Sequence, residues 1–259
     1  MSATAATRAQ AFVRTAELPE APPLRYDVTK VAIDFDAAKE QATVVGSDVI
    51  AFVKGITPEQ RSDIVNASLL AQLVAKKQVP DPADFQQVKA WYEAYFHALS
   101  QLGFVIQDQG FAEYQEDSQS FEAHEAIMKV AATLLAGSPT ALALVRSTLE
   151  ALKSMQTDSP WLSLFNRESR SANTARFQVS LVEQDGAGGA LLVLMAFGME
   201  ASQTLTQVLF FKFRKDEVRL GHYSGKVSIN APVLEAVRDV VAGKLVAYAT
   251  EYVKGLPDL

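Results

Sequence analysis

The spacing of apolar residues changes once along the chain, near residue 170. Before this point apolar residues recur every three or four positions, as they do along one face of a helix. After it they alternate with polar residues over about fifty positions, as they do along strands. A final stretch with helical spacing runs almost to the C-terminus. The pattern predicts a helical layer, an antiparallel sheet and one closing helix.

Junctions between a capping residue and a proline predict where the helices begin. The cap side chain accepts a hydrogen bond from an unpaired N–H of the first turn, and proline in the first helical position gives up only a donor without a partner. The four junctions are Thr57-Pro58, Asp81-Pro82, Ser138-Pro139 and Ser159-Pro160. Together with the apolar spacing, they predict helices over 35–54, 58–77, 82–102, 119–136 and 139–155, and a short helical turn over 160–166.

The second half of the chain predicts four strands, over 176–184, 190–199, 204–214 and 218–229, with a glycine-rich hairpin turn at 185–189. The strand over 190–199 is apolar on both faces, which is typical of a central strand covered on both sides. The strand over 218–229 is more polar, and we expect it at an edge. A helix over 230–254 follows. Because one helix covers only one face of a sheet, we expect the N-terminal helices on the other face.

The expected fold class is therefore α+β, with an N-terminal layer of about five helices, a four-stranded antiparallel meander sheet and a C-terminal helix packed on the sheet. Prolines at positions 19, 22 and 23 predict an extended N-terminal arm over residues 1–27. Residues 28–259 are expected to form a single integrated domain. Its helical part spans 28–168, and its sheet and C-terminal helix span 169–259.

Charge and cysteine content narrow the function classes. The net charge of −6 disfavours nucleic-acid binding, which depends on Lys and Arg neutralising phosphates. The absence of cysteine excludes disulfides, thiol nucleophiles and thiolate metal sites. No apolar secretory segment is present at the N-terminus, and the longest apolar run, 190–199, is too short for a transmembrane helix. We expect a cytoplasmic protein, or one exported without a classical signal peptide.

Motifs of known chemistry fail on inspection. His124-Glu125 begins like a zinc-protease helix, but Met128 stands where the second histidine belongs. Gly221 to Lys226 has the wrong glycine spacing for a phosphate-binding loop. The sequence therefore predicts no metal site, no cofactor and no catalytic residue.

The segment 91–125 is the best candidate for a binding region. It is rich in aromatic residues, contains acids without any Lys or Arg, and holds two of the three histidines. Aromatic rings beside unpaired acids suit a cationic or amphipathic partner. The candidate binding residues are Trp91, Tyr95, His97, Phe111, Glu113, Tyr114, Glu116, Asp117, Glu122 and His124.

Three functional hypotheses follow. The first is a non-catalytic interaction protein, such as an exported bacterial effector or toxin component, that docks a protein partner through 91–125. The second is a hydrolase that uses carboxylates from 108–125 as acid and base. The third is a membrane-active protein that inserts a hairpin formed by 190–213, and we do not favour it. A homodimer that pairs the expected edge strand 218–229 across a two-fold axis is possible.

Overall fold

A computed structural model describes residues 2–21, 33–106, 111–114 and 119–257. The strands are β1 (Gln41–Val45), β2 (Asp48–Phe52), β3 (Phe104–Val105), β4 (Ala112–Glu113), β5 (Ser120–Glu122), β6 (Thr174–Gln184), β7 (Ala190–Ala201), β8 (Lys212–Arg214), β9 (Val218–Ile229) and β10 (Val253–Gly255). Eight of them form one mixed sheet in the order β10-β1-β2-β6-β7-β9-β3, with β4 also paired to β9. Only β2 and β6 are parallel neighbours. Strands β5 and β8 form a separate ribbon.

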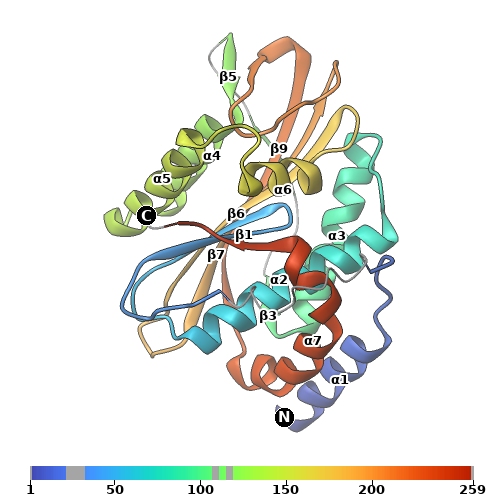
Figure 1. The fold of residues 1–259 in the computed structure, drawn as a ribbon, viewed down its shortest axis with the longest axis vertical. Helices are drawn as coiled ribbons and strands as arrows, with labels where there is room; N and C mark the ends of the chain where they lie inside the picture. The colour runs from blue at the N-terminus through green and yellow to red at the C-terminus, as the bar shows by residue number, and fades with distance from the viewer. Residues whose placement is uncertain (1, 22–32, 107–110, 115–118, 258–259) are drawn as a thin grey trace.

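Helices cover both faces of this sheet (Figure 1). One face carries α1 (Ser2–Thr15), α2 (Pro58–Gln78), α3 (Phe85–Gln101) and α7 (Ala231–Tyr252). The other carries α4 (Ala123–Leu134), α5 (Pro139–Ser154) and α6 (Pro160–Ser169). The chain is thus a mixed α/β protein of seven helices in its described part. The expected coverage of both faces is confirmed, but the C-terminal helix shares its face with the first three helices.

The expected helix over 35–54 is wrong, because this segment holds the hairpin of β1 and β2. Val45 pairs with Asp48, so Gly46 and Ser47 form a two-residue turn. Gly46 has φ +56°, in the left-handed region that such turns require. The flanking residues are mostly β-branched, and they favour strands. This hairpin adds strands to the sheet that the four-stranded expectation lacks.

The capping junctions locate three of the expected helix starts. Thr57 caps α2 in a capping box with Gln60, and the Ser159 hydroxyl caps α6. Helix α5 begins at Pro139 as expected. The fourth junction is wrong, since α3 begins at Phe85, where the Asp84 side chain accepts a hydrogen bond from Gln87 N. The start expected at 119 is also wrong by a few residues, because β5 precedes α4.

The extended backbone expected over residues 1–27 is wrong for Ser2–Thr15, which is the helix α1. This helix packs on α7, as Figure 1 shows. The ammonium group of Lys244 on α7 donates to the carbonyl oxygens of Val13 and Ala16, and so satisfies the C-terminal end of α1. Contact with α7 therefore supplies the hydrogen-bond donors that the last carbonyl groups of α1 would lack in an isolated helix.

Strand β7 has the predicted central position. Leu192, Leu194 and Ala196 face one core, and Val193 and Met195 face the other. Its partners are β6 and β9, so the expected hairpin of 190–213 does not form.

The expected strand over 204–214 is mostly wrong, because only Lys212–Arg214 is a strand. The preceding loop bonds to other elements instead. Leu205 N donates to Ala172 O, and Val208 N donates to the side-chain oxygen of Asn166.

Strand β9 is not the expected edge strand. It pairs with β7 along its length and with β3 and β4 on its other side. On that side β3 and β4 pair with only two residues of β9 each, so the pairing of copies through this strand stays a prediction. Within the described part of the chain, no helix is both long enough and apolar enough to cross a membrane.

Arg61 of α2 anchors the β1–β2 hairpin to the helical layer. The side chain is fully buried, and its guanidinium donates to Gln41 Oε1 at 2.6 Å, Lys39 O at 2.8 Å and Val53 O at 3.0 Å. Arg61 Nε donates to Ile56 O at 2.9 Å. Gln41 is the first residue of β1, and the other acceptors lie in the segments that flank the hairpin, so one side chain holds both of its ends.

Replacing Arg61 with Met should lower the free energy of unfolding by roughly 2–4 kcal/mol, because it removes the hydrogen bonds of a buried guanidinium and leaves the buried Ile56 carbonyl without its donor. Urea unfolding monitored by circular dichroism measures this change. The exposed Arg146 of α5 provides the control, since Arg146→Met should change stability by less than about 0.5 kcal/mol. Equal effects of the two substitutions would contradict the anchoring role.

Candidate functional site

The candidate residues of 91–125 do not form one surface. Trp91 and Tyr95 lie in the core, with 0% and 1% of their surfaces exposed, and their rings stack at 5.4 Å. They cannot contact a partner in this conformation. His97 is exposed on α3, and its ring lies 6.3 Å from that of Phe12 on α1. Phe111 is partly buried, 4.8 Å from the ring of Tyr92.

The remaining candidates lie near the β4 edge of the sheet and at the start of α4. Glu113 is exposed on β4, and the Tyr114 ring lies 6.2 Å from that of His222 on β9. Glu116 and Asp117 lie outside the described residues.

Glu122 and His124 meet Lys153 of α5 in a small polar cluster. Glu122 Oε2 lies 3.2 Å from Lys153 Nζ and 3.0 Å from His124 Nδ1, the latter without the angle of a hydrogen bond. Glu125 Oε2 accepts from Glu122 N at 2.8 Å, which completes a capping box for α4. Glu125 thus helps to cap the start of α4, and Glu122 forms an ion pair with Lys153.

A cleft of about 600 Å³ opens beside Tyr114, between α4 and β9. Its size falls within the range of small-ligand and side-chain pockets. Lys129, Thr133 and Leu134 form the helical wall, and His222 and Ser224 come from the strand. The described lining contains a cation, hydroxyl groups and apolar side chains, and no carboxylate.

His222 contributes a neutral imidazole to this cleft. Burial lowers the pKa of His222, so the ring is uncharged at neutral pH. Its Nδ1 is buried and has no hydrogen-bond partner in the described structure. A neutral ring can donate at one nitrogen and accept at the other. The ring of His222 therefore lines the cleft without adding a second charge.

A buried polar layer lies between the sheet and helices α2 and α3, within the apolar core of that face, and the sequence pattern did not predict it. Asp48 of β2 accepts hydrogen bonds from Ser68 of α2 at 3.1 Å and from Ser180 of β6 at 3.0 Å. Burial raises the pKa of Tyr95 and of Tyr92 on α3, and the nearby charge of Asp48 adds to both shifts. Burial raises the pKa of Asp48 to about 7, against the hydrogen bonds from the two serines.

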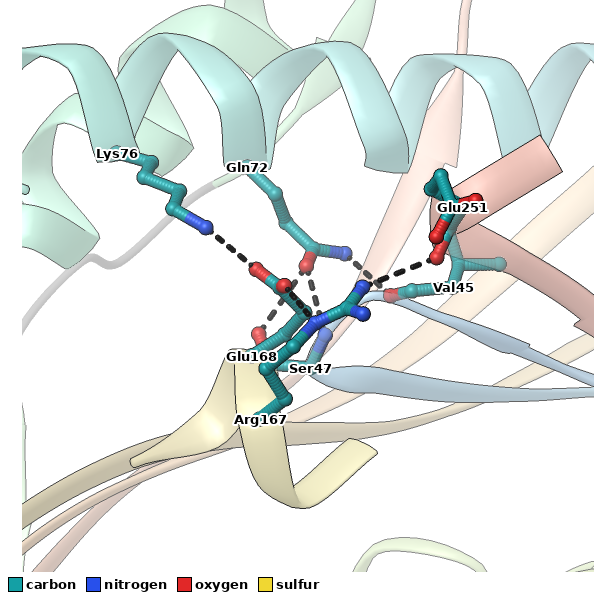
Figure 2. A network of polar contacts seen from close by, with 7 residues as sticks. All are labelled: Val45, Ser47, Gln72, Lys76, Arg167, Glu168 and Glu251. Atoms are coloured by element: carbon teal, nitrogen blue, oxygen red, sulfur yellow. Dashed lines mark hydrogen bonds and ion pairs between the residues drawn. The ribbon is translucent and has the colours of Figure 1, made fainter. Parts of the chain in front are cut away.

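Gln72 extends this layer to the β1–β2 turn (Figure 2). Its Oε1 accepts from Ser47 N at 2.9 Å, and its Nε2 donates to Val45 O at 2.8 Å. On the sheet, Gln178 Nε2 donates to the Tyr92 hydroxyl oxygen at 3.2 Å. The signal in the sequence was the alternation of Arg176, Gln178 and Ser180 with apolar residues along β6, which looks like a solvent-facing side.

The hydrolase hypothesis depends on the acids of 108–125, of which those at positions 108, 116 and 117 lie outside the described residues. Asp48 is fully buried in the layer between helices and sheet, and no carboxylate is among the described residues that line the cleft. Within residues 2–21, 33–106, 111–114 and 119–257, no three His, Cys, Asp or Glu side chains gather as metal ligands would.

Comparisons with known proteins identify no family for this chain. No protein-family model and no curated protein matches the chain. Among solved structures, a delta-endotoxin is 15% identical with a TM-score of 0.39, over 85% of this chain and 97% of the other. The Evf virulence factor is 13% identical with a TM-score of 0.35, over 84% and 87% of the two chains. Likeness at this level carries no argument about this chain.

The raised pKa of Asp48 predicts that stability falls as pH rises. The folded state keeps a proton up to about pH 7, whereas the unfolded chain releases it near 3.8, so the folded state loses relative stability between these values. Between pH 5 and pH 8.5 this contribution is about 2–3 kcal/mol. Asp48→Asn should remove it, so urea unfolding at both pH values should show a smaller loss in the variant.

The exposed Asp158 on the loop before α6 gives the matched control, and Asp158→Asn should follow the wild-type pH dependence. If the loss of stability between the two pH values is the same in Asp48→Asn as in the wild type, the assignment of this titration to Asp48 is incorrect.

Proposed function

We propose that the protein is a non-catalytic interaction protein whose docking site is the cleft beside Tyr114. The observation that supports this is the cleft itself, which lies where the aromatic segment 91–125 reaches the surface. The expectation of a protein partner is kept, but the site is reduced from the whole segment to Tyr114 and the residues of α4 and β9 around it.

The lining defines the chemistry of the partner segment. Val130 and Leu134 suit an apolar side chain, and Tyr114 adds an aromatic surface. His222 and Ser224 supply hydrogen-bonding groups on the strand side, and Lys129 adds positive charge. We therefore assign as partner a protein segment that inserts an apolar side chain and carries a neighbouring carboxylate, rather than the cationic partner that the acids of the segment suggested.

The role as an exported effector or toxin component stays part of this proposal. Its support is the cysteine-free composition, which suits a chain that passes between redox compartments. The hydrolase alternative has no carboxylate pair among the described residues of the cleft, and the membrane alternative relied on a hairpin of 190–213 that the structure replaces with a central strand and a loop. Neither is favoured.

Selection from a library of short linear peptides tests the docking site while the partner is still unidentified. We expect enriched peptides to carry an apolar residue beside an acid. Thr133 lines the cleft and is exposed on α4, so Thr133→Arg should fill the cleft and lower peptide affinity at least tenfold. Ala132 is an exposed neighbour on the same helix and does not line the cleft. Ala132→Arg should leave affinity unchanged, as measured by fluorescence anisotropy.

Exchanging the acid of an enriched peptide for its amide should also weaken binding, and Lys129→Ala should reduce this difference. Failure to enrich any peptide, or equal binding to the Thr133→Arg and Ala132→Arg variants, would refute the docking site.

A further inference from the structure

A small cavity lies behind the polar layer, between α2, α3 and α6 and the β1–β2 turn. The centre of a water-sized sphere can move within about 10 Å³ of this cavity, which is room for one ligand the size of a water molecule or a halide ion. Its lining includes Lys76 of α2, Trp91 of α3, Glu168 of α6 and Arg176 of β6. This cavity is separate from the cleft beside Tyr114, and a ligand bound in it would be independent of the proposed function.

Two buried donors belong to residues of this lining and have no acceptor. Trp91 Nε1 and Arg176 Nε are both buried without a hydrogen-bond partner in the described structure. Trp91 is fully buried, and Arg176 is 5% exposed. A buried N–H without an acceptor costs roughly 1–3 kcal/mol, and neither an indole N–H nor a guanidinium N–H can accept. A ligand that satisfies both groups must be an acceptor.

The charges around the cavity favour an anion over a neutral acceptor. Glu168 is the lining carboxylate, and it is already shared by Lys76 Nζ at 2.7 Å and Arg167 Nε at 2.8 Å (Figure 2). Arg176 forms no ion pair with any described residue, and its guanidinium carbon lies 4.7 Å from the centre of the Trp91 ring. The lining therefore holds two cations, Lys76 and Arg176, against one carboxylate.

A buried guanidinium in this position is costly, and Glu168 and Asp81 compensate only part of its charge, without forming an ion pair with it. Burial lowers the pKa of Arg176, which reflects the loss of hydration of the charged group. The nearby ring of Trp91 offsets part of this loss through a cation–π contact. A bound anion would balance the remaining charge and accept hydrogen bonds at the same time.

We propose that this cavity binds a single monovalent anion of chloride size. The anion accepts hydrogen bonds from Trp91 Nε1 and Arg176 Nε and lies beside Lys76. The small space favours a monatomic anion over phosphate or sulfate, and the two positive side chains disfavour a metal cation. The ion would link α2 and α3 to β6 in the folded state only, so its binding stabilises the fold.

Tryptophan fluorescence provides a local test, because the chain has two tryptophans, Trp91 and Trp161. A Trp161→Phe background leaves Trp91 as the reporter. Bromide is a heavy-atom quencher that fits a chloride site, so titration at constant ionic strength with fluoride as the replaced anion should give saturable quenching. Chloride should reverse it competitively.

Thermal unfolding gives an independent readout in the wild-type protein. At a chloride concentration ten times the Kd from competition, the Tm should exceed that in fluoride by about 2–3 °C. Arg176→Met should abolish both saturable quenching and the chloride-dependent Tm shift. If this variant does not fold, Lys76→Met should weaken halide binding at least fivefold.

The outcomes separate the possibilities. Saturable, chloride-competed quenching that is lost in Arg176→Met, or weakened in Lys76→Met, supports the site. Absent or linear quenching with equal Tm values in chloride and fluoride overturns it and leaves water as the acceptor. Saturable quenching that persists unchanged in the variants overturns it as well, since the halide would then bind elsewhere.

Discussion

The polar layer between the sheet and helices α2 and α3 is the constraint on which the rest of the fold depends. Apolar packing is tolerant of small shifts, whereas buried polar groups must meet their partners at hydrogen-bond distance. Asp48 joins α2 to β2 and β6 through two serines, and Gln72 joins α2 to the β1–β2 turn. These contacts fix where α2 lies on the sheet, and Tyr92 does the same for α3 through Gln178. The opposite face, under α4 to α6, is joined mainly by apolar side chains.

Helix caps and runs of apolar residues predicted the fold correctly where the structure of a segment depends on its own residues. Thr57 with Gln60 located α2, Ser159 located α6, and the doubly apolar run located β7 at the centre of the sheet. The predictions were wrong where the structure of a segment depends on contacts with residues far away in the sequence. The β1–β2 hairpin pairs with β6 and β10, and the loop after β7 bonds to α6 instead of pairing as a strand. The helix predicted over 35–54 was based on the helical spacing of four apolar residues, and the turn that Gly46-Ser47 favours was not taken into account.

The candidate site was only partly predictable, because composition does not tell core from surface. All three aromatic residues Trp91, Tyr95 and Tyr114 were candidate binding residues, but Trp91 and Tyr95 are buried in the core and Tyr114 lies at the cleft. His222 and Ser224, which complete the cleft, come from a strand about a hundred residues further along the chain, and no spacing rule connects them to Tyr114. The alternation of polar residues on β6 was visible, but only the position of α2 shows that they face inward.

A double-mutant cycle on Ser47 and Gln72 tests most directly whether the polar layer holds α2 on the sheet. Ser47→Ala removes a hydroxyl that lies 3.1 Å from Gln72 Oε1 and 3.0 Å from Gln178 Oε1, the two acceptors that share its single proton. Gln72→Met removes the first of these acceptors at similar volume. Urea unfolding of the two single variants and the double variant gives the coupling energy. We predict a coupling of about 1–2 kcal/mol, with both single variants destabilised. Additive effects, within about 0.3 kcal/mol, would contradict the view that these side chains act as one layer.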